Sequence, residues 1–94
     1  MNDINYAERG REVRLLARQL VLDYLNTRPE AESRGPGISQ TEISRACGLL
    51  WGDYPKSAAT QQQYWIVGLL RQLEQEERIS QDPVTRKWRC RSGG

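Results

Sequence analysis

Polar residues between positions 56 and 71 are the first candidates for chemistry in this sequence. Glutamine can form a bidentate pair with adenine, and serine or threonine can contact bases or phosphates. Lys56 precedes the stretch, where the free N–H groups of a helix N-terminus favour a phosphate. Six further residues lie on or beside one face of a predicted helix: Ser57, Thr60, Gln61, Gln63, Tyr64 and Arg71. Such a face can read base edges in a major groove, and a solvated helix surface explains the same pattern.

A second group of candidates is the basic cluster near the end of the chain, which contains Arg86, Lys87, Arg89 and Arg91. The alternation of a predicted strand places Trp88 and Cys90 on one side and Lys87, Arg89 and Arg91 on the other. Arg86 and Lys87 are expected at the tip of a hairpin, with Arg89 one pleat further along. They are suited to phosphate contacts, which give affinity and register without sequence information. The alternative is an edge strand that its charges protect from pairing with other chains.

Catalytic residue patterns are missing from the sequence. There is no histidine, and neither Cys47 nor Cys90 has a neighbouring base at motif spacing. The carboxylates are grouped only in the run at 74–77, and the Gly-Pro-Gly at 35–37 lacks the ending of a phosphate-binding loop. We therefore expect no enzymatic activity, no metal and no cofactor. The two cysteines are expected as buried free thiols, with a disulfide between them left open.

The composition of the 94 residues fits one small domain, with 37% hydrophobic and 28% charged residues. A formal net charge of only +2 makes the local distribution of charge more informative than the total. The sequence contains neither a signal peptide nor an apolar run long enough for a membrane span. We expect a protein without membrane contact that is cytoplasmic, or nucleoid-associated if the source is bacterial.

The first predicted element is a helix over residues 8–26, after a flexible N-terminus at 1–7 in which Asp3 or Asn5 can cap a first turn. Pro29 ends the helical pattern. Leu15 and Leu22 fall away from the main stripe, either as incidental exposure or as the seam of a homodimer. The stripe expected to be buried consists of Val13, Leu16, Ala17, Leu20, Val21 and Tyr24.

A polar loop at 28–37 precedes Ile38, which is placed where a strand of one or two residues can pair with a later hairpin. Ser39 and Glu42 then form a capping-box pattern for a short helix over 40–47. Its expected buried residues are Ile43, Ala46 and Cys47, and Gly48 ends it.

The stretch 57–79 is expected to form a long helix that ends just before a strand, after a turn at 49–56 whose Trp51 and Tyr54 are expected to contact the core. A hairpin follows, with strands at 78–81 and 86–91 joined by a turn at 82–85, and residues 92–94 form a flexible tail. The stripe of the long helix expected to be buried consists of Gln62, Ile66, Leu69 and Leu73, widened by Trp65 and Leu70.

This order of elements resembles the winged helix-turn-helix superfamily. The segment ISQTEISRACG resembles the second helix of such domains, and IVGLLRQLEQEERISQDPVTRKWRC resembles a recognition helix running into a wing. The expected fold class is mainly α with a small β-hairpin (α+β), a three-helix winged helix-turn-helix domain over 8–91. The turn at 49–56 departs from the pattern, because it is longer than the usual connection.

The resemblance implies double-stranded DNA as the partner, with the third helix in the major groove and the basic wing on the backbone. Such a domain is expected in a transcription regulator, or in a mobile-element or restriction-type DNA-processing protein. The alternative is a winged helix that serves as a protein-protein interaction module in an assembly. Its partner surface would consist of Leu15, Leu22, Val67 and Trp51.

Overall fold

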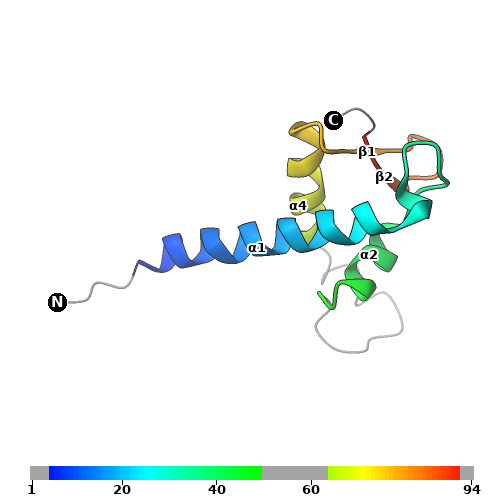
Figure 1. Cartoon of the computed structure of the whole chain (residues 1–94). Helices are drawn as coiled ribbons and strands as arrows, with labels where there is room; N and C mark the ends of the chain where they lie inside the picture. The colour runs from blue at the N-terminus through cyan, green and yellow to red at the C-terminus, as the bar shows by residue number, and fades with distance from the viewer. Residues whose placement is uncertain (1–4, 50–63, 92–94) are drawn as a thin grey trace.

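A long helix, α1 (Tyr6–Thr27), supports the rest of the fold on its C-terminal half (Figure 1). The computed structural model describes residues 5–49 and 64–91. Along these residues the further elements are η1 (Pro29–Ala31), α2 (Gln40–Ala46), α4 (Tyr64–Gln75), β1 (Ile79–Gln81) and β2 (Trp88–Cys90). β1 and β2 pair antiparallel, with Ser80 opposite Arg89. The described part is thus mainly helical with a small hairpin, which confirms the predicted α+β class.

Helix α1 begins at Tyr6 rather than Glu8, because Asn5 caps it. The Asn5 side chain accepts a hydrogen bond from the Glu8 backbone N–H at 3.0 Å. Residues 5–7, expected in the flexible N-terminus, therefore belong to the cap and first turn. The helix ends at Thr27, and η1 starts with Pro29 as the break at this proline predicts.

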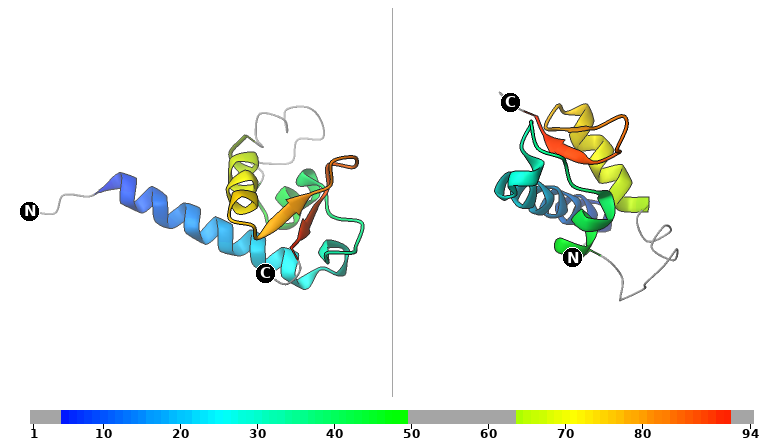
Figure 2. Two further views of the ribbon diagram at one scale, coloured as in Figure 1. Left: turned by 90° about the horizontal axis from the view of Figure 1, so that it is seen from above. Right: turned by 90° about the vertical axis from the view of Figure 1, so that its right-hand side faces the viewer.

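Ile38 forms the predicted short strand. It exchanges two backbone hydrogen bonds with Trp88 of β2, at 2.9 and 2.8 Å, and so adds a single antiparallel bridge to the hairpin. The next residue, Ser39, caps α2 by accepting from the Glu42 N–H, as predicted. Gly48 takes a positive φ of 69° just after α2, which confirms its role at the helix end. Figure 2 shows α2 and the hairpin on the same part of α1.

The hydrophobic core lies between the C-terminal half of α1, α2, α4 and the hairpin. The apolar stripe of α4 is buried as predicted for its described part, and Trp65 at its edge is exposed. The helix ends at Gln75 and not near 79 as predicted, because the chain turns there, with Glu77 at a positive φ of 62°, before β1 begins. In α2 the structure corrects one prediction, since Ser44 is buried and Ala46 is exposed. The core residues are Val21, Leu22, Leu25, Ala31, Ile38, Ile43, Ile66, Leu69, Leu70, Leu73, Ile79 and Trp88.

The buried face of α1 differs from the prediction. Val13, Leu16 and Leu20 are exposed. The first half of the helix, which carries Val13 and Leu16, extends past the body (Figure 1), and Leu20 lies on the side of the helix away from Val21, Leu22 and Leu25. Leu22 and Leu25 instead join Val21 in the core. Since Leu22 is only 5% exposed, the predicted homodimer seam through Leu15 and Leu22 is wrong.

Candidate nucleic-acid interface

The connection between β1 and β2 is an ordered turn built around Asp82. The Asp82 carboxylate accepts hydrogen bonds from the backbone N–H groups of Val84 and Thr85, at 2.8 and 2.9 Å. The Asp82 N–H donates to the Lys87 carbonyl, and the Arg86 N–H donates to the Asp82 carbonyl. Arg86 takes a positive φ of 67°, the left-handed conformation that closes the turn. The turn is therefore fixed by its own hydrogen bonds.

The electrostatics of this turn hold Asp82 in its charged form. The two backbone N–H groups, and then the Arg89 guanidinium at 3.0 Å, lower the pKa of Asp82 from 3.8 to about 2. Because the folded pKa lies below the unfolded one, the ionised carboxylate stabilises the fold above pH 4. This contribution is lost as the pH falls towards about 2.

Asp82→Asn is expected to lower stability at neutral pH, since the amide keeps the shape of the side chain without its charge. The difference from the wild type should shrink as the pH falls from about 4 to about 2, the interval between the unfolded and folded pKa. Urea unfolding across this range measures it. Glu32→Gln is the control, because the exposed Glu32 side chain makes no hydrogen bond to any described residue. A stability difference between Asp82→Asn and the wild type that stays constant over this pH range would contradict the proposed link between stability and the ionisation of Asp82.

Arg89 holds the turn against the loop that follows η1. Its Nε donates to the Gly35 carbonyl and its Nη2 to Asp82, and the side chain is largely covered. The strand alternation that grouped Arg89 with Lys87 and Arg91 does not reveal this contact. Arg89 thus already makes hydrogen bonds within the protein, and these bonds position the turn.

Arg86 and Lys87 are the open cations of the turn. Both are exposed, and neither has a carboxylate within 4.0 Å among the described residues. A fixed backbone therefore carries two side chains whose charges face solvent. Such a pair can bind an anion without first breaking an internal ion pair.

Arg71 of α4 lies beside the hairpin. Its guanidinium is 5.1 Å from the centre of the Trp88 ring, and it pairs with Glu74 at 3.0 Å. Tyr64 is the first residue of α4. The other predicted contacts before α4, at Lys56, Ser57, Thr60, Gln61 and Gln63, lie outside the described residues, as do Trp51 and Tyr54.

Sequence reasoning did not single out Arg34 as a candidate. It is exposed, and no described carboxylate pairs with it. It directly precedes Gly35, whose carbonyl Arg89 binds, so it belongs to the loop that is tied to the turn. The only sequence signal for it was an arginine within a Gly- and Pro-containing loop.

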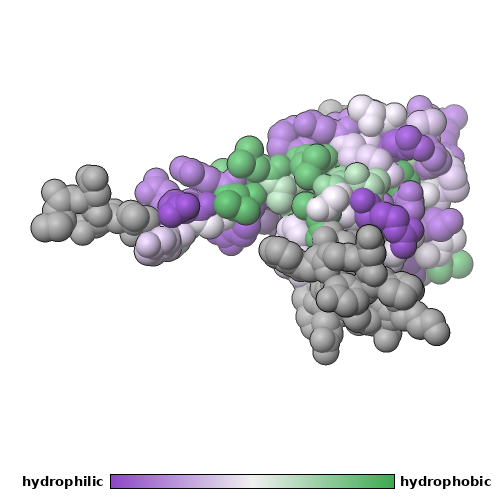
Figure 3. All heavy atoms as spheres, turned by 90° about the horizontal axis from the view of Figure 1, so that it is seen from below, coloured by the Kyte–Doolittle hydropathy of each residue, from purple (hydrophilic) through white to green (hydrophobic). Residues whose placement is uncertain are grey.

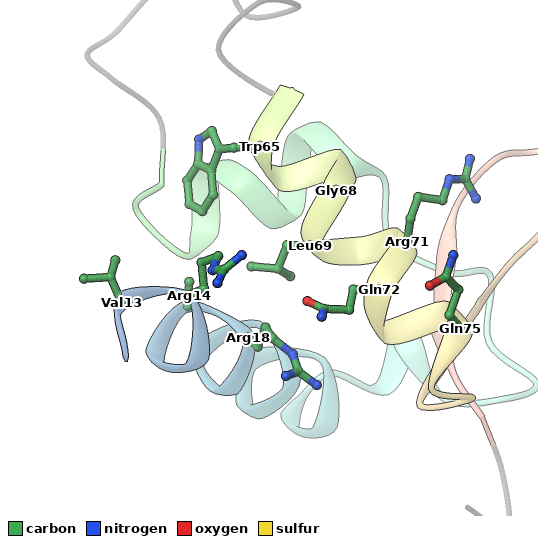
Figure 4. A pocket seen from close by; sticks show the side chains of 10 residues that line it. Val13, Arg14, Arg18, Trp65, Gly68, Leu69, Arg71, Gln72 and Gln75 are labelled. Atoms are coloured by element: carbon green, nitrogen blue, oxygen red, sulfur yellow. The ribbon is translucent and has the colours of Figure 1, made fainter. Parts of the chain in front are cut away.

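A hollow of about 520 Å³ lies between α1 and α4 (Figure 4). Val13, Trp65 and Leu69 contribute apolar surface to it, and its described lining contains no acidic residue. Arg18 also lines it and pairs with Glu76, just after α4. Its other lining residues are Arg14, Ala17, Gly68, Arg71, Gln72 and Gln75.

The cysteines carry no sign of reactivity. Both are free thiols, as predicted, although each is only half-buried, and this burial raises the pKa of each. Over the residues that the structure describes, no three His, Cys, Asp or Glu side chains are grouped so that they could hold a metal ion. No helix in that part of the chain combines the length and apolarity of a membrane span.

The chain matches no protein-family model, curated protein or solved structure at a significant level.

Proposed function

We propose that this chain is a winged helix-turn-helix domain that binds double-stranded DNA. The observation that carries the proposal is the ordered turn with two exposed cations, Arg86 and Lys87, that no described carboxylate neutralises. The order of helix, single-bridge strand, short helix, longer helix and hairpin supports it. In this arrangement the hairpin turn grips the backbone, and the residues before α4 enter the major groove.

The side chains divide into three roles on this proposal. Arg86 and Lys87 contact phosphates, while Arg89 positions them through Asp82 and Gly35. Lys56, Ser57, Thr60, Gln61, Gln63 and Tyr64 remain the proposed groove contacts, with Arg71 at the side of α4 next to Trp88. Such a domain would serve a transcription regulator or a mobile-element or restriction-type DNA-processing protein.

Arg86→Ala with Lys87→Ala is expected to weaken binding to all duplexes alike. Each lost phosphate contact lowers the slope of log affinity against log salt by about 0.9, so the double variant should lose about 1.8. Fluorescence anisotropy with a mixed-sequence duplex at several salt concentrations measures both effects.

The matched control is Arg78→Ala with Arg91→Ala, which removes the same charge from the other end of the hairpin. Arg78 and Arg91 are exposed next to the paired residues Ile79 and Cys90. This control should keep most of the salt slope. Equal loss in both double variants would indicate attraction by total charge, and unchanged affinity in the Arg86/Lys87 variant would remove the turn from the mechanism.

The alternative function is a protein-protein interaction module. The surface that supports it in the structure differs from the surface that the sequence indicated. Leu22 is buried and Val67 is half-buried, so neither forms an open partner surface. Among the described residues, most of the large exposed apolar side chains lie on α1, where Leu15, which the sequence indicated, is joined by Val13, Leu16 and Leu20; Trp65 and Val84 are exposed elsewhere.

A further inference from the structure

The first half of α1 extends away from the body of the protein (Figures 1 and 2). Its buried residues, Val21, Leu22 and Leu25, all lie in the second half. Every residue from Tyr6 to Leu16 is exposed. The side chains of more than two turns of helix are therefore open to solvent, although Val13 and Arg14 also line the hollow beside α4.

An apolar stripe begins on this projecting half of α1 and continues into the second half, on the side opposite the buried residues. It consists of Val13, Leu16 and Leu20, which are 64%, 72% and 41% exposed and are separated by three and four residues. We call these three residues the α1 stripe. Figure 3 shows apolar side chains on the surface where α1 leaves the body. Three such residues at heptad spacing are the pattern of a helix that packs against another helix.

The projecting helix gains little stability from its own domain. Short helices are marginal in water, and most helical stability in proteins comes from packing an apolar face. Gly10 lowers the helix propensity further. Val13 and Leu16, although apolar, are thus exposed in a part of the helix that the described fold covers little.

Charges on the same face indicate which partner fits. Arg9 and Asp23 are each seven residues from Leu16, so the three lie along one line of the helix. No described residue forms an ion pair with either: Arg9 lies over the Tyr6 ring, and Asp23 accepts a hydrogen bond from Gln19. The stripe has a positive charge at one end and a negative charge at the other. When two copies of this face meet in antiparallel orientation, each positive charge therefore lies opposite a negative one.

We propose that the α1 stripe binds a second copy of this chain in an antiparallel pair of α1 helices, with the two-fold axis at Leu16. Leu16 then meets the partner's Leu16, and Val13 lies beside the partner's Leu20. Arg9 faces the partner's Asp23 at both ends. A parallel pair would place Arg9 against the partner's Arg9 and Asp23 against the partner's Asp23, which is repulsive.

The contact is short, because the line from Arg9 to Asp23 spans about 21 Å of helix. An interface of this length falls at the lower end of the size range for specific complexes. A dissociation constant on the order of micromolar is therefore expected. The dimer is independent of the proposed DNA binding, and it is measured without DNA.

The first test compares Leu16→Glu with Leu15→Glu by sedimentation equilibrium over a range of concentrations. Leu15 is also exposed but lies off the stripe, one residue and about 100° away around the helix. Leu16→Glu should raise the dimer dissociation constant at least about tenfold, and Leu15→Glu should change it little. Circular dichroism should show that both variants remain folded, since neither side chain is in the core.

The second test reverses the charges. Arg9→Asp alone and Asp23→Arg alone should each weaken self-association, since like charges then meet at both ends of the pair. An equimolar mixture of the two variants should form a heterodimer. In it, the aspartate introduced at position 9 of one chain meets the arginine introduced at position 23 of the other. At the opposite end the unchanged Asp23 and Arg9 meet as in the wild type.

The single variants also distinguish the two orientations of the helices. In a parallel pair like charges meet already in the wild type, so neither single variant would associate more weakly than the wild type. Weakening in each single variant, followed by recovery in the mixture to the affinity of the wild type, is the result expected for the antiparallel pair.

A wild-type chain that stays monomeric at high concentration would overturn the proposal. Equal effects of Leu16→Glu and Leu15→Glu would also overturn it, and so would single charge variants that associate as well as the wild type or a mixture that fails to associate.

Discussion

Trp88→Ala is expected to destabilise the domain by about 3–5 kcal/mol, the range for removing a large aromatic side chain from a core. Trp88 is only 1% exposed, and its backbone forms the bridge to Ile38. The Arg71 guanidinium lies over its ring. The whole stability of a domain of this size is about 5–15 kcal/mol, so the variant should be close to unfolded in mild urea.

Trp65→Ala is the matched control for this prediction, because it makes the same substitution at a side chain that is 41% exposed. It should cost less than about 1 kcal/mol. Urea unfolding followed by circular dichroism compares the two variants without relying on tryptophan fluorescence. Similar losses in both would mean that the hairpin is not the core element that its burial indicates.

Local patterns in the sequence predicted the hairpin and the elements that flank it. The short strand at Ile38, the cap at Ser39 and the end of α2 at Gly48 each depend on one or a few neighbouring residues. The buried stripe of α4 also follows from helical spacing alone. Local interactions of this kind can be predicted from the sequence without knowledge of the tertiary structure.

Which face of α1 is buried could not be predicted from the sequence in the same way. Its apolar residues satisfy a helical period on more than one side, so spacing alone favoured Leu16 as a core residue where the structure buries Leu22. The choice depends on where α4 and the hairpin contact the helix. Periodicity identifies a face that can be buried, and it does not identify the partner that buries it.

The role of Arg89 was hidden for a related reason. Strand alternation placed it on a basic surface, but its Nε donates to the Gly35 carbonyl, far away in the sequence. Only Arg86 and Lys87 of the predicted wing cations keep open charges at the described turn. A candidate site predicted from charge alone therefore includes two kinds of residue: those that can contact a ligand, and those that hold the contacting residues in place.

Gly37→Ala is expected to destabilise the protein by about 1–3 kcal/mol through backbone strain alone. Gly37 is buried and has a φ of 89°, which L side chains rarely adopt. A Cβ atom there would lie 2.8 Å from the Lys87 Cβ and 3.3 Å from the Trp88 carbonyl oxygen. Relief of these contacts would push β2 away from Ile38, so the bridge should weaken as well.

Gly10→Ala is the matched control and should have the opposite sign. Gly10 lies inside α1 with no described atom within 4 Å of an added Cβ, so the change should stabilise the helix by about 0.5–1 kcal/mol. Urea midpoints give both signs, and hydrogen exchange at the Ile38 and Trp88 amides locates the damage in Gly37→Ala. If Gly37→Ala left both the urea midpoint and the hydrogen exchange unchanged, the loop would not approach β2 this closely. Faster exchange confined to these two amides would tie the loss to the contact that joins the loop to the turn of Arg86 and Lys87.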